Sequence, residues 1–175
     1  FGSGAGMPLG CLQGSDCIEI AKEVGQAAGS FVYENAVKMF ARMHPAGLQR
    51  AVWVCNPSLM PWLLQMSVAI GTSGSHIPVL KESNGQFTLL GLPAVFSDVM
   101  KAAGTSGDIA LCDFQSYAIG LRRDLTIDQS IHPGFTSDLV SFRILARVDG
   151  MSTWDKPLTP KNGDTMSPFI KLAAR

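Results

Sequence analysis

Apolar and polar residues alternate regularly along residues 139–149. One face carries the apolar residues Phe142, Ile144, Ala146 and Val148, and the other carries Ser141, Arg143, Leu145, Arg147 and Asp149. Since successive side chains of a strand point to opposite faces, this period of two predicts a β-strand with one apolar face.

The segment before this strand predicts three shorter strands, over residues 109–112, 115–120 and 125–131. We expect turns between them at Asp113–Phe114 and at Arg122–Asp124, where polar residues interrupt the apolar runs. A final apolar run predicts a strand over 168–172.

Helical spacing appears in the first third of the chain. Ser30 is a suitable N-cap for a helix that runs to about Met43. A buried strand over 51–55 follows, and Asn56 and Pro57 then predict the cap and first residue of a short helix that Pro61 distorts. The predicted core of this region consists of Trp53, Val54, Leu63, Leu64, Leu90, Val95, Phe96, Leu111 and Ile119.

The stretch LLGLPAVFSD, residues 89–98, reads as a strand broken by Gly91 and Pro93. Proline cannot donate a hydrogen bond to a sheet ladder, so it is confined to edges, strand starts and bulges. Taken alone, the break predicts an edge strand that turns a corner.

Charge excludes several classes of function. Lys and Arg total 14, as do Asp and Glu, so the net charge is zero, which disfavours a protein whose main task is to bind nucleic acid or an anionic membrane. Residues 51–80 carry no charged residue, but prolines and polar residues interrupt them well short of the ~20 apolar residues of a membrane span. Only 16% of the residues are charged, and the mean hydropathy of +0.19 suggests that other subunits cover some apolar surface.

No reactive constellation emerges from the motifs. GSGAG at 2–6 lacks the spacing of a nucleotide loop, and the three histidines, His44, His76 and His132, are scattered. The four cysteines have no metal-ligand spacing and read as free thiols of a reducing compartment. We therefore predict no catalytic residue, no metal and no cofactor, and we interpret Arg122 and Arg123, beside Asp124, as a turn or subunit-contact cluster.

Six segments in series resemble the major capsid proteins of tailed bacteriophages, which have the Hong Kong 97 type of fold. The segments are FGSGAGMPLGCL, WVCNPS, LLGLPAVFSDVM, GDIALCDFQSYAIGLRRDLTI, FTSDLVSFRILARVDG and PFIKL. They cover nearly the whole chain in the order that the family shows. Ala94, where the family usually has valine, is a mild departure.

The resemblance implies an α+β fold with three parts. We expect a loop that leads into the peripheral (P) domain at 1–14, an axial (A) domain with a mixed sheet and flanking helices at 15–130, and C-terminal P-domain strands at 131–175. The family's extended loop and spine helix would precede Phe1 and are not in this sequence. Gly91 and Pro93 would then bend a sheet of a wedge-shaped axial domain.

The resemblance implies a structural protein without enzymatic activity. It would self-associate into pentamers and hexamers of an icosahedral shell around DNA, with no sequence-specific nucleic-acid contact and no membrane contact. A full-length protein would also meet a scaffold, a portal and a head-maturation protease, in the virion and, during assembly, in the cytoplasm of the bacterial host. Candidate subunit-contact residues are Gly74, Ser75, Arg122, Arg123, Arg143 and Arg147, and candidate structural residues are Gly91, Pro93, Asp113 and Phe114.

Two alternatives stay open. The nearest is the shell protein of a bacterial encapsulin-type nanocompartment, which shares the fold. The other is a small α+β hydrolase or ligand-binding domain, which a deep pocket joining His76 or His132 to a serine and a carboxylate would favour. Some family members also cross-link a lysine to an asparagine with the help of a glutamate, and the matching positions here are Asp138 and Leu145.

Overall fold

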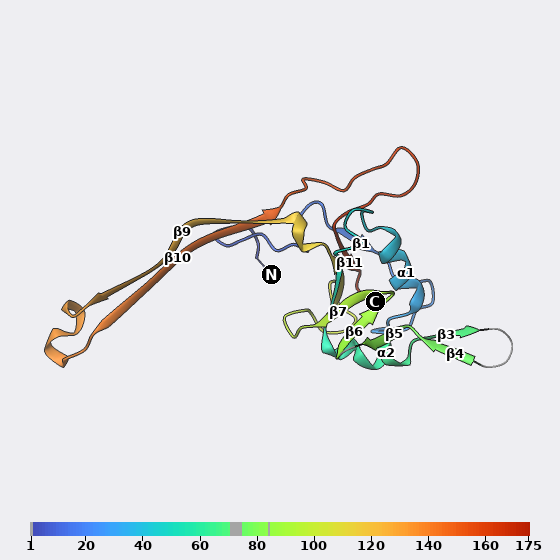
Figure 1. Cartoon of the computed structure of the whole chain (residues 1–175), viewed down its shortest axis with the longest axis horizontal. Coiled ribbons are helices and arrows are strands. Elements are labelled where there is room, and N and C mark those ends of the chain that lie inside the picture. The colour runs from blue at the N-terminus through green and yellow to red at the C-terminus, as the bar shows by residue number, and fades with distance from the viewer. Residues whose placement is uncertain (1, 71–74, 84) are drawn as a thin grey trace.

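The computed structural model describes residues 2–70, 75–83 and 85–175. Figure 1 shows a body built on a β-sheet, from which a long two-stranded arm projects. The sheet is mixed and has the strand order β1-β11-β8-β2-β7-β6-β5. Its strands are β1 (Ile18–Ile20), β2 (Val52–Cys55), β5 (Leu80–Ser83), β6 (Gln86–Leu89), β7 (Leu92–Phe96), β8 (Ile109–Cys112) and β11 (Phe169–Leu172).

The middle of the sheet is covered on both faces. Along β8, Ile109 and Leu111 join the larger apolar cluster, whereas Ala110 and Cys112 join the smaller one on the opposite face. The helices α1 (Tyr33–Ala41) and α2 (Met60–Gln65) pack in the larger cluster, and the loop around Leu12 covers the smaller. This double burial explains why these strands are apolar runs without alternation.

The predicted helix over 30–43 is confirmed, but it begins later than expected. Val32 is the N-cap, and Ser30 instead donates a hydrogen bond from its hydroxyl to the carbonyl of Ala27 at 2.7 Å. The side-chain oxygen of Asn35 accepts from the backbone N–H of Val32 at 3.3 Å, so Asn35 satisfies the helix start that Ser30 was predicted to cap.

Asn56 caps the next helical segment as predicted. Its side chain accepts from the backbone N–H of Ser58 at 2.9 Å, and Pro57 begins the 3₁₀ helix η1 (Pro57–Leu59) that leads into α2. Pro61 lies in the first turn of α2, where its missing N–H disrupts nothing.

The break at Gly91 and Pro93 is a hairpin turn and not the corner of an edge strand. Leu90 and Gly91 both have positive φ, 52° and 82°, and form the two-residue turn between β6 and β7. The strand β7 lies between β2 and β6, inside the sheet. The pairing of β7 with β2 begins at Ala94. Pro93, which has no N–H to donate, therefore lies just before the β2–β7 ladder and does not interrupt it.

The expected core is correct for some residues and wrong for others. Trp53, Leu63 and Leu111 are fully buried, and Val54, Leu90 and Phe96 are partly buried. The other three, Leu64, Val95 and Ile119, are exposed. Apolar character alone does not say which face of a short helix or strand meets the sheet.

A buried ion pair joins the last strand's end to the sheet. The guanidinium of Arg175 binds both carboxylate oxygens of Asp108 at 2.9 and 2.7 Å, and both side chains are completely buried. Arg175 also donates to the carbonyl of Ser30 and lies over the ring of Phe31. This cluster fixes β11 between β1 and β8.

The remaining strands form two hairpins. β3 (Ser67–Ile70) pairs with β4 (Ser75–Pro78), and β9 (Tyr117–Ser130) pairs with β10 (Ser141–Ser152) to form the arm. The strands predicted at 115–120 and 125–131 are therefore one strand, and no turn exists at Arg122–Asp124. The predicted domain boundary at residue 130 cuts across the pairing of β9 with β10, and β11 belongs to the sheet of the body.

Adjacent leucines on α2 test the observed core. Leu63 is fully buried and Leu64 is 60% exposed. We expect Leu63→Ala to lower the free energy of unfolding by about 2–5 kcal/mol because it leaves a cavity, whereas Leu64→Ala changes it by about 0.5 kcal/mol or less. Urea unfolding followed by Trp fluorescence measures both, and equal losses for the two variants would contradict the assigned faces of α2.

Candidate assembly surface

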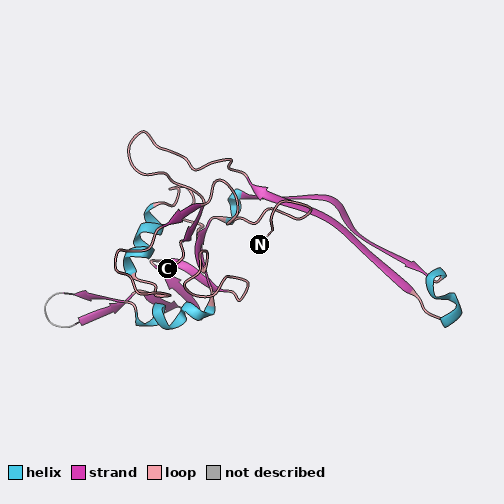
Figure 2. Ribbon diagram, turned by 180° about the vertical axis from the view of Figure 1, so that it is seen from behind, coloured by secondary structure: helices cyan, strands magenta, loops and turns pink. Residues whose placement is uncertain are grey.

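The arm is the most unusual feature of the chain. Figure 2 shows β9 and β10 running far from the body, with the 3₁₀ segment η3 (His132–Ser137) at the far end. Within the described residues, these two strands pair only with each other. An isolated two-stranded ribbon has no core of its own, so its faces stay open.

One face of the arm carries a stripe of apolar residues on both sides of the bend, with Gln129 opposite Phe142 at its outer end. In the antiparallel register Ile144 lies opposite Ile127, Val148 opposite Leu121, and Gly150 opposite Ile119. Residues directly opposite each other share a face, so these pairs and Phe142 form one stripe. The large residues of this apolar stripe are 49–70% exposed: Ile119, Leu121, Ile127, Phe142, Ile144 and Val148.

The other face of the arm is mostly polar. Ser141 lies opposite Ser130, Leu145 opposite Thr126, and Arg143 opposite Asp128. Arg143 and Asp128 form an ion pair with an N–O distance of 3.5 Å between exposed side chains, which contributes little stability. The arm is therefore amphipathic, with one face suited to burial and one suited to water.

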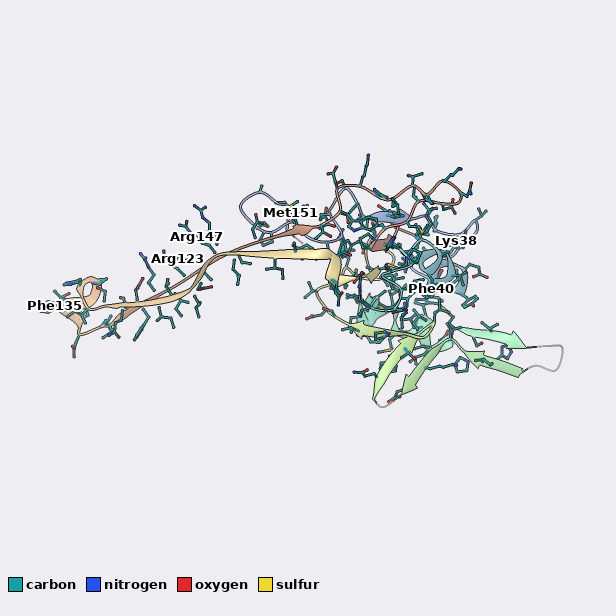
Figure 3. All side chains as sticks on the ribbon, turned by 45° about the horizontal axis from the view of Figure 1, so that its top comes forward. Lys38, Phe40, Arg123, Phe135, Arg147 and Met151 are labelled. Atoms are coloured by element: carbon teal, nitrogen blue, oxygen red, sulfur yellow. The ribbon has the colours of Figure 1, made fainter. Side chains whose placement is uncertain are left out.

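A double β-bulge occupies the position of the predicted turn. Between the pairs Leu145–Thr126 and Val148–Leu121, β10 advances by three residues and β9 by five, in two register shifts. Two extra residues restore the alternation of β9, so that Leu121 and Ile127 stay on the same face. Bulges bend a strand and increase its twist, and Figure 3 shows the arm bending beside Arg123 and Arg147.

The predicted contact arginines all lie on the arm, but in two places. Arg122, Arg123 and Arg147 gather at the bend, where Arg123 and Arg147 are directly opposite each other. Arg143 lies farther out along β10 and pairs with Asp128. Gly74 lies outside the described residues, and Ser75 is the first residue of β4.

Asp113 and Phe114 form the predicted turn at the root of the arm. The buried carboxylate of Asp113 accepts from the backbone N–H of Gln115 at 3.1 Å and from the guanidinium of Arg50 at 2.7 Å. It thereby caps the single-turn 3₁₀ helix η2 (Phe114–Ser116) that joins β8 to β9. Phe114 itself is half exposed.

The N-terminal loop braces the same root. The hydroxyl of Tyr117 donates to the carbonyl of Leu9 at 2.5 Å, and the N–H of Leu9 donates to the carbonyl of Gly150 at 2.8 Å. A side chain at residue 150 would displace the Tyr117 ring, because an added Cβ would lie 2.6 Å from the Tyr117 hydroxyl. The loop, β9 and β10 are thus tied together where the arm leaves the body.

A second candidate surface lies on the body. A groove of about 400 Å³ runs between the β3–β4 hairpin and the β6–β7 turn, lined by Tyr33, Val68, Ile77, Pro78, Val79, Lys81, Thr88, Leu90 and Gly91. It is shallow and mainly apolar. Gly91 therefore contributes a turn to the wall of a surface groove.

The histidines do not assemble into a reactive site. Nδ1 of His76 lies 3.4 Å from the hydroxyl of Ser67 on the exposed β3–β4 hairpin, whereas His132 is on η3 and His44 stacks edge-on against Trp154. Across residues 2–70, 75–83 and 85–175, no three His, Cys, Asp or Glu side chains are grouped to hold a metal ion. No helix in that part of the chain is long and apolar enough to cross a membrane.

Three cysteines lie close together near the root of the arm, beside Tyr117. A hydrogen bond with Cys112 lowers the pKa of Cys11 to about 7, because it stabilises the thiolate more than burial opposes it. Burial raises the pKa of Cys17 to about 12, and the pKa of Cys112 lies well above its usual value because of the bond with Cys11 and burial. Sequence spacing gave no sign of this cluster, since Cys11 and Cys112 are a hundred residues apart.

Comparison with known proteins identifies what this architecture is similar to. The chain matches the model of the Phage capsid family over residues 1–161. No curated protein matches it at a significant level.

Two solved structures share its fold, the capsid of an empty GTA particle (20% identity, TM-score 0.59) and the capsid of a native GTA particle (19% identity, TM-score 0.61), both computed with C5 symmetry. Each match covers 95% of this chain but only 57% and 56%, respectively, of the other. The chain therefore spans a little over half the length of these capsid chains.

The pKa of Cys11 predicts its reactivity. Because the thiolate is the nucleophile, iodoacetamide at pH 7 should alkylate Cys11 first, and the rate should rise between about pH 6 and 8. Cys112→Ala removes the hydrogen bond and should slow this reaction roughly tenfold at pH 7, since an ordinary thiol is only a few per cent ionised there. Cys17→Ala is the control and should leave the rate unchanged. Peptide mass spectrometry gives the order of modification, and alkylation of Cys17 as fast as Cys11 would refute the assignment.

Proposed function

Because the chain belongs to the phage capsid family, we propose that it forms part of the wall of an icosahedral phage-like head, as the axial domain and P-domain hairpin of a Hong Kong 97 type subunit. Membership of this family and the shared fold support a structural role over an enzymatic one. The same comparisons support a phage-like head over a nanocompartment, and nothing in the histidine environments favours a hydrolase.

The observation that carries the proposal is the apolar stripe of the arm. A ribbon with Ile119, Ile127 and Ile144 open to water is a poor surface for a free monomer, because exposed contiguous apolar residues promote association. The polar face opposite marks the stripe as a surface to be covered from one side only. Other parts of a longer chain or neighbouring subunits of a shell would provide that cover.

We place the domain boundaries at the ends of the arm and not at residue 130. The axial domain would comprise the seven-stranded sheet with α1 and α2, and the P-domain portion would comprise residues 117–152 together with the loop that Tyr117 ties to them. This division keeps β9 with β10 and β11 with its sheet, so each part contains complete hydrogen-bonded ladders.

The axial domains would contact one another in rings of five and six. A ring of identical subunits joins two different surfaces by one repeated contact. The groove beside Gly91 is a suitable surface for such a contact. Gly74, Ser75 and the glycine loop at 104–107 are further candidates from the sequence. Arg143 on the arm would contact neighbouring capsomers.

The location and partners follow from this role. The mature protein would reside in the virion wall, after assembly in the cytoplasm of the bacterial host. A scaffold, a portal and a head-maturation protease would act on the full-length protein. Its contact with the enclosed DNA would not depend on sequence.

A charge on the apolar stripe tests the proposal. Ile144→Asp should abolish particle formation by the full-length protein, because a buried unpaired carboxylate would oppose covering of the stripe. Ser141→Asp, exposed on the polar face of the same strand, is the matched control and should assemble. Light scattering and negative-stain microscopy detect particles, and unchanged thermal unfolding of the body would exclude misfolding. Normal particles from Ile144→Asp would refute the role of the stripe.

The family's covalent cross-link should be absent. Leu145 occupies the position that the resemblance assigns to the assisting glutamate, and Asp138, an exposed residue after η3, occupies that of the asparagine. Leucine cannot accept a proton from an attacking amine, so we expect mature particles to separate into single chains on a reducing denaturing gel. A ladder of covalent oligomers would overturn this expectation.

A further inference from the structure

We propose that the bend of the arm binds a phosphate-class oxyanion, held by Arg122, Arg147 and the glycine-rich loop 2–7. These groups line a notch of about 260 Å³, formed by Gly4, Gly6, Met7, Arg122, Arg147, Val148 and Asp149. The notch brings together two sequence features that are more than a hundred residues apart and that the proposed shell role leaves unexplained. The inference goes beyond shell formation and does not rest on it.

The arginines at the bend bring positive charges close together. Arg123 lies directly opposite Arg147, and like charges in that position destabilise a strand pair. Among the described residues, no carboxylate forms an ion pair with Arg122, Arg123 or Arg147. The one carboxylate that lines the notch, Asp149, accepts a hydrogen bond from the N–H of Gly150 at 2.8 Å. An external anion would relieve the repulsion that the bulge creates.

The loop offers backbone donors on the other side of the notch. Gly4 and Gly6 have φ of +79° and +72°, which directs the chain into an open curve that residues with side chains rarely adopt. The N–H of Gly4 is engaged by the isolated bridge between Ser3 and Leu9. The N–H groups of residues 5–7 form no backbone hydrogen bond within the described residues, and no atom lies within 4 Å of the Cβ position of Gly6. Backbone N–H groups and guanidinium forks are the donors that phosphate oxygens accept from.

The donor set favours phosphate over a carboxylate from a second copy of this chain. A single guanidinium fork satisfies both oxygens of a carboxylate. Here the donors come from β9, from β10 and from the loop, which suits an anion with oxygens on several sides. The phosphate could be free inorganic phosphate or a phosphodiester of nucleic acid, and the two sources can be separated experimentally.

The test is a titration of the whole chain with inorganic phosphate, followed by ³¹P NMR and compared with sodium chloride at matched ionic strength. We expect Arg122→Gln and Arg147→Gln each to raise the dissociation constant for phosphate about tenfold or more, since each removes a charge-assisted hydrogen bond. Arg147→Lys should raise the dissociation constant less, because lysine keeps the positive charge and lacks only the two-pronged guanidinium. Arg143→Gln, already paired with Asp128 elsewhere on the arm, should leave binding unchanged.

A short DNA duplex then identifies the source of the phosphate. Binding of DNA that requires Arg122 and Arg147 and that inorganic phosphate displaces would assign the notch to nucleic acid, and binding of inorganic phosphate alone would assign it to the free anion. A phosphate effect no larger than that of sodium chloride would mean simple screening and would overturn the proposal. Equal weakening by Arg143→Gln and Arg122→Gln would overturn it as well.

Discussion

A two-stranded ribbon cannot bury its own side chains, and the arm of this protein depends on that constraint. Each face of β9–β10 must meet water or another surface. One face, with Ile127 and Ile144, is suited to another surface, and the opposite face, with the Arg143–Asp128 pair, is suited to water. The double bulge preserves this separation over the bend, because two extra residues return β9 to the same phase. Without the second shift, Ile119 and Leu121 would move to the polar face.

The body supplies the rigid base from which the arm extends. β8 and β11 are antiparallel neighbours, so the whole arm is part of the connection between two paired strands of the sheet. At the start of that connection Asp113 caps η2 and binds Arg50. The pair of Asp108 and Arg175 joins the opposite ends of β8 and β11, on the side away from the arm. Removing one partner of the buried Asp108–Arg175 pair would leave an uncompensated charge, so this pair stabilises the pairing of β8 with β11, and Asp113 fixes the turn from which the arm begins.

Local signals in the sequence predicted the elements well, and contacts distant in sequence decided the rest. Asn56 and Asp113 act through hydrogen bonds to residues two positions away, and Pro57 acts through its own backbone geometry at the first helical position. The residues Arg122–Asp124 look like a turn because charged residues interrupt an apolar run, yet they lie within β9, where Arg123 pairs with Arg147 of β10. The burial of Leu63 and not Leu64 likewise depends on which side of α2 meets the sheet. The notch and the thiol cluster join residues about a hundred positions apart, which no local pattern can reveal.

The position of the arginines follows from the same constraint as the stripe. A bulge leaves residues outside the regular ladder, so their side chains need not follow the alternation of apolar and polar positions. Arg122 occupies such a position, because it has no partner on β10 and belongs to neither the apolar nor the polar face of the ladder. At the bend, positive charge therefore accumulates without interrupting the apolar stripe. The glycine loop lies against the bend because Leu9 bonds to both Tyr117 and Gly150 at the root. The double bulge that keeps the stripe continuous thus also creates the cationic notch. The same bulge therefore separates a surface for apolar contacts from a surface for anions.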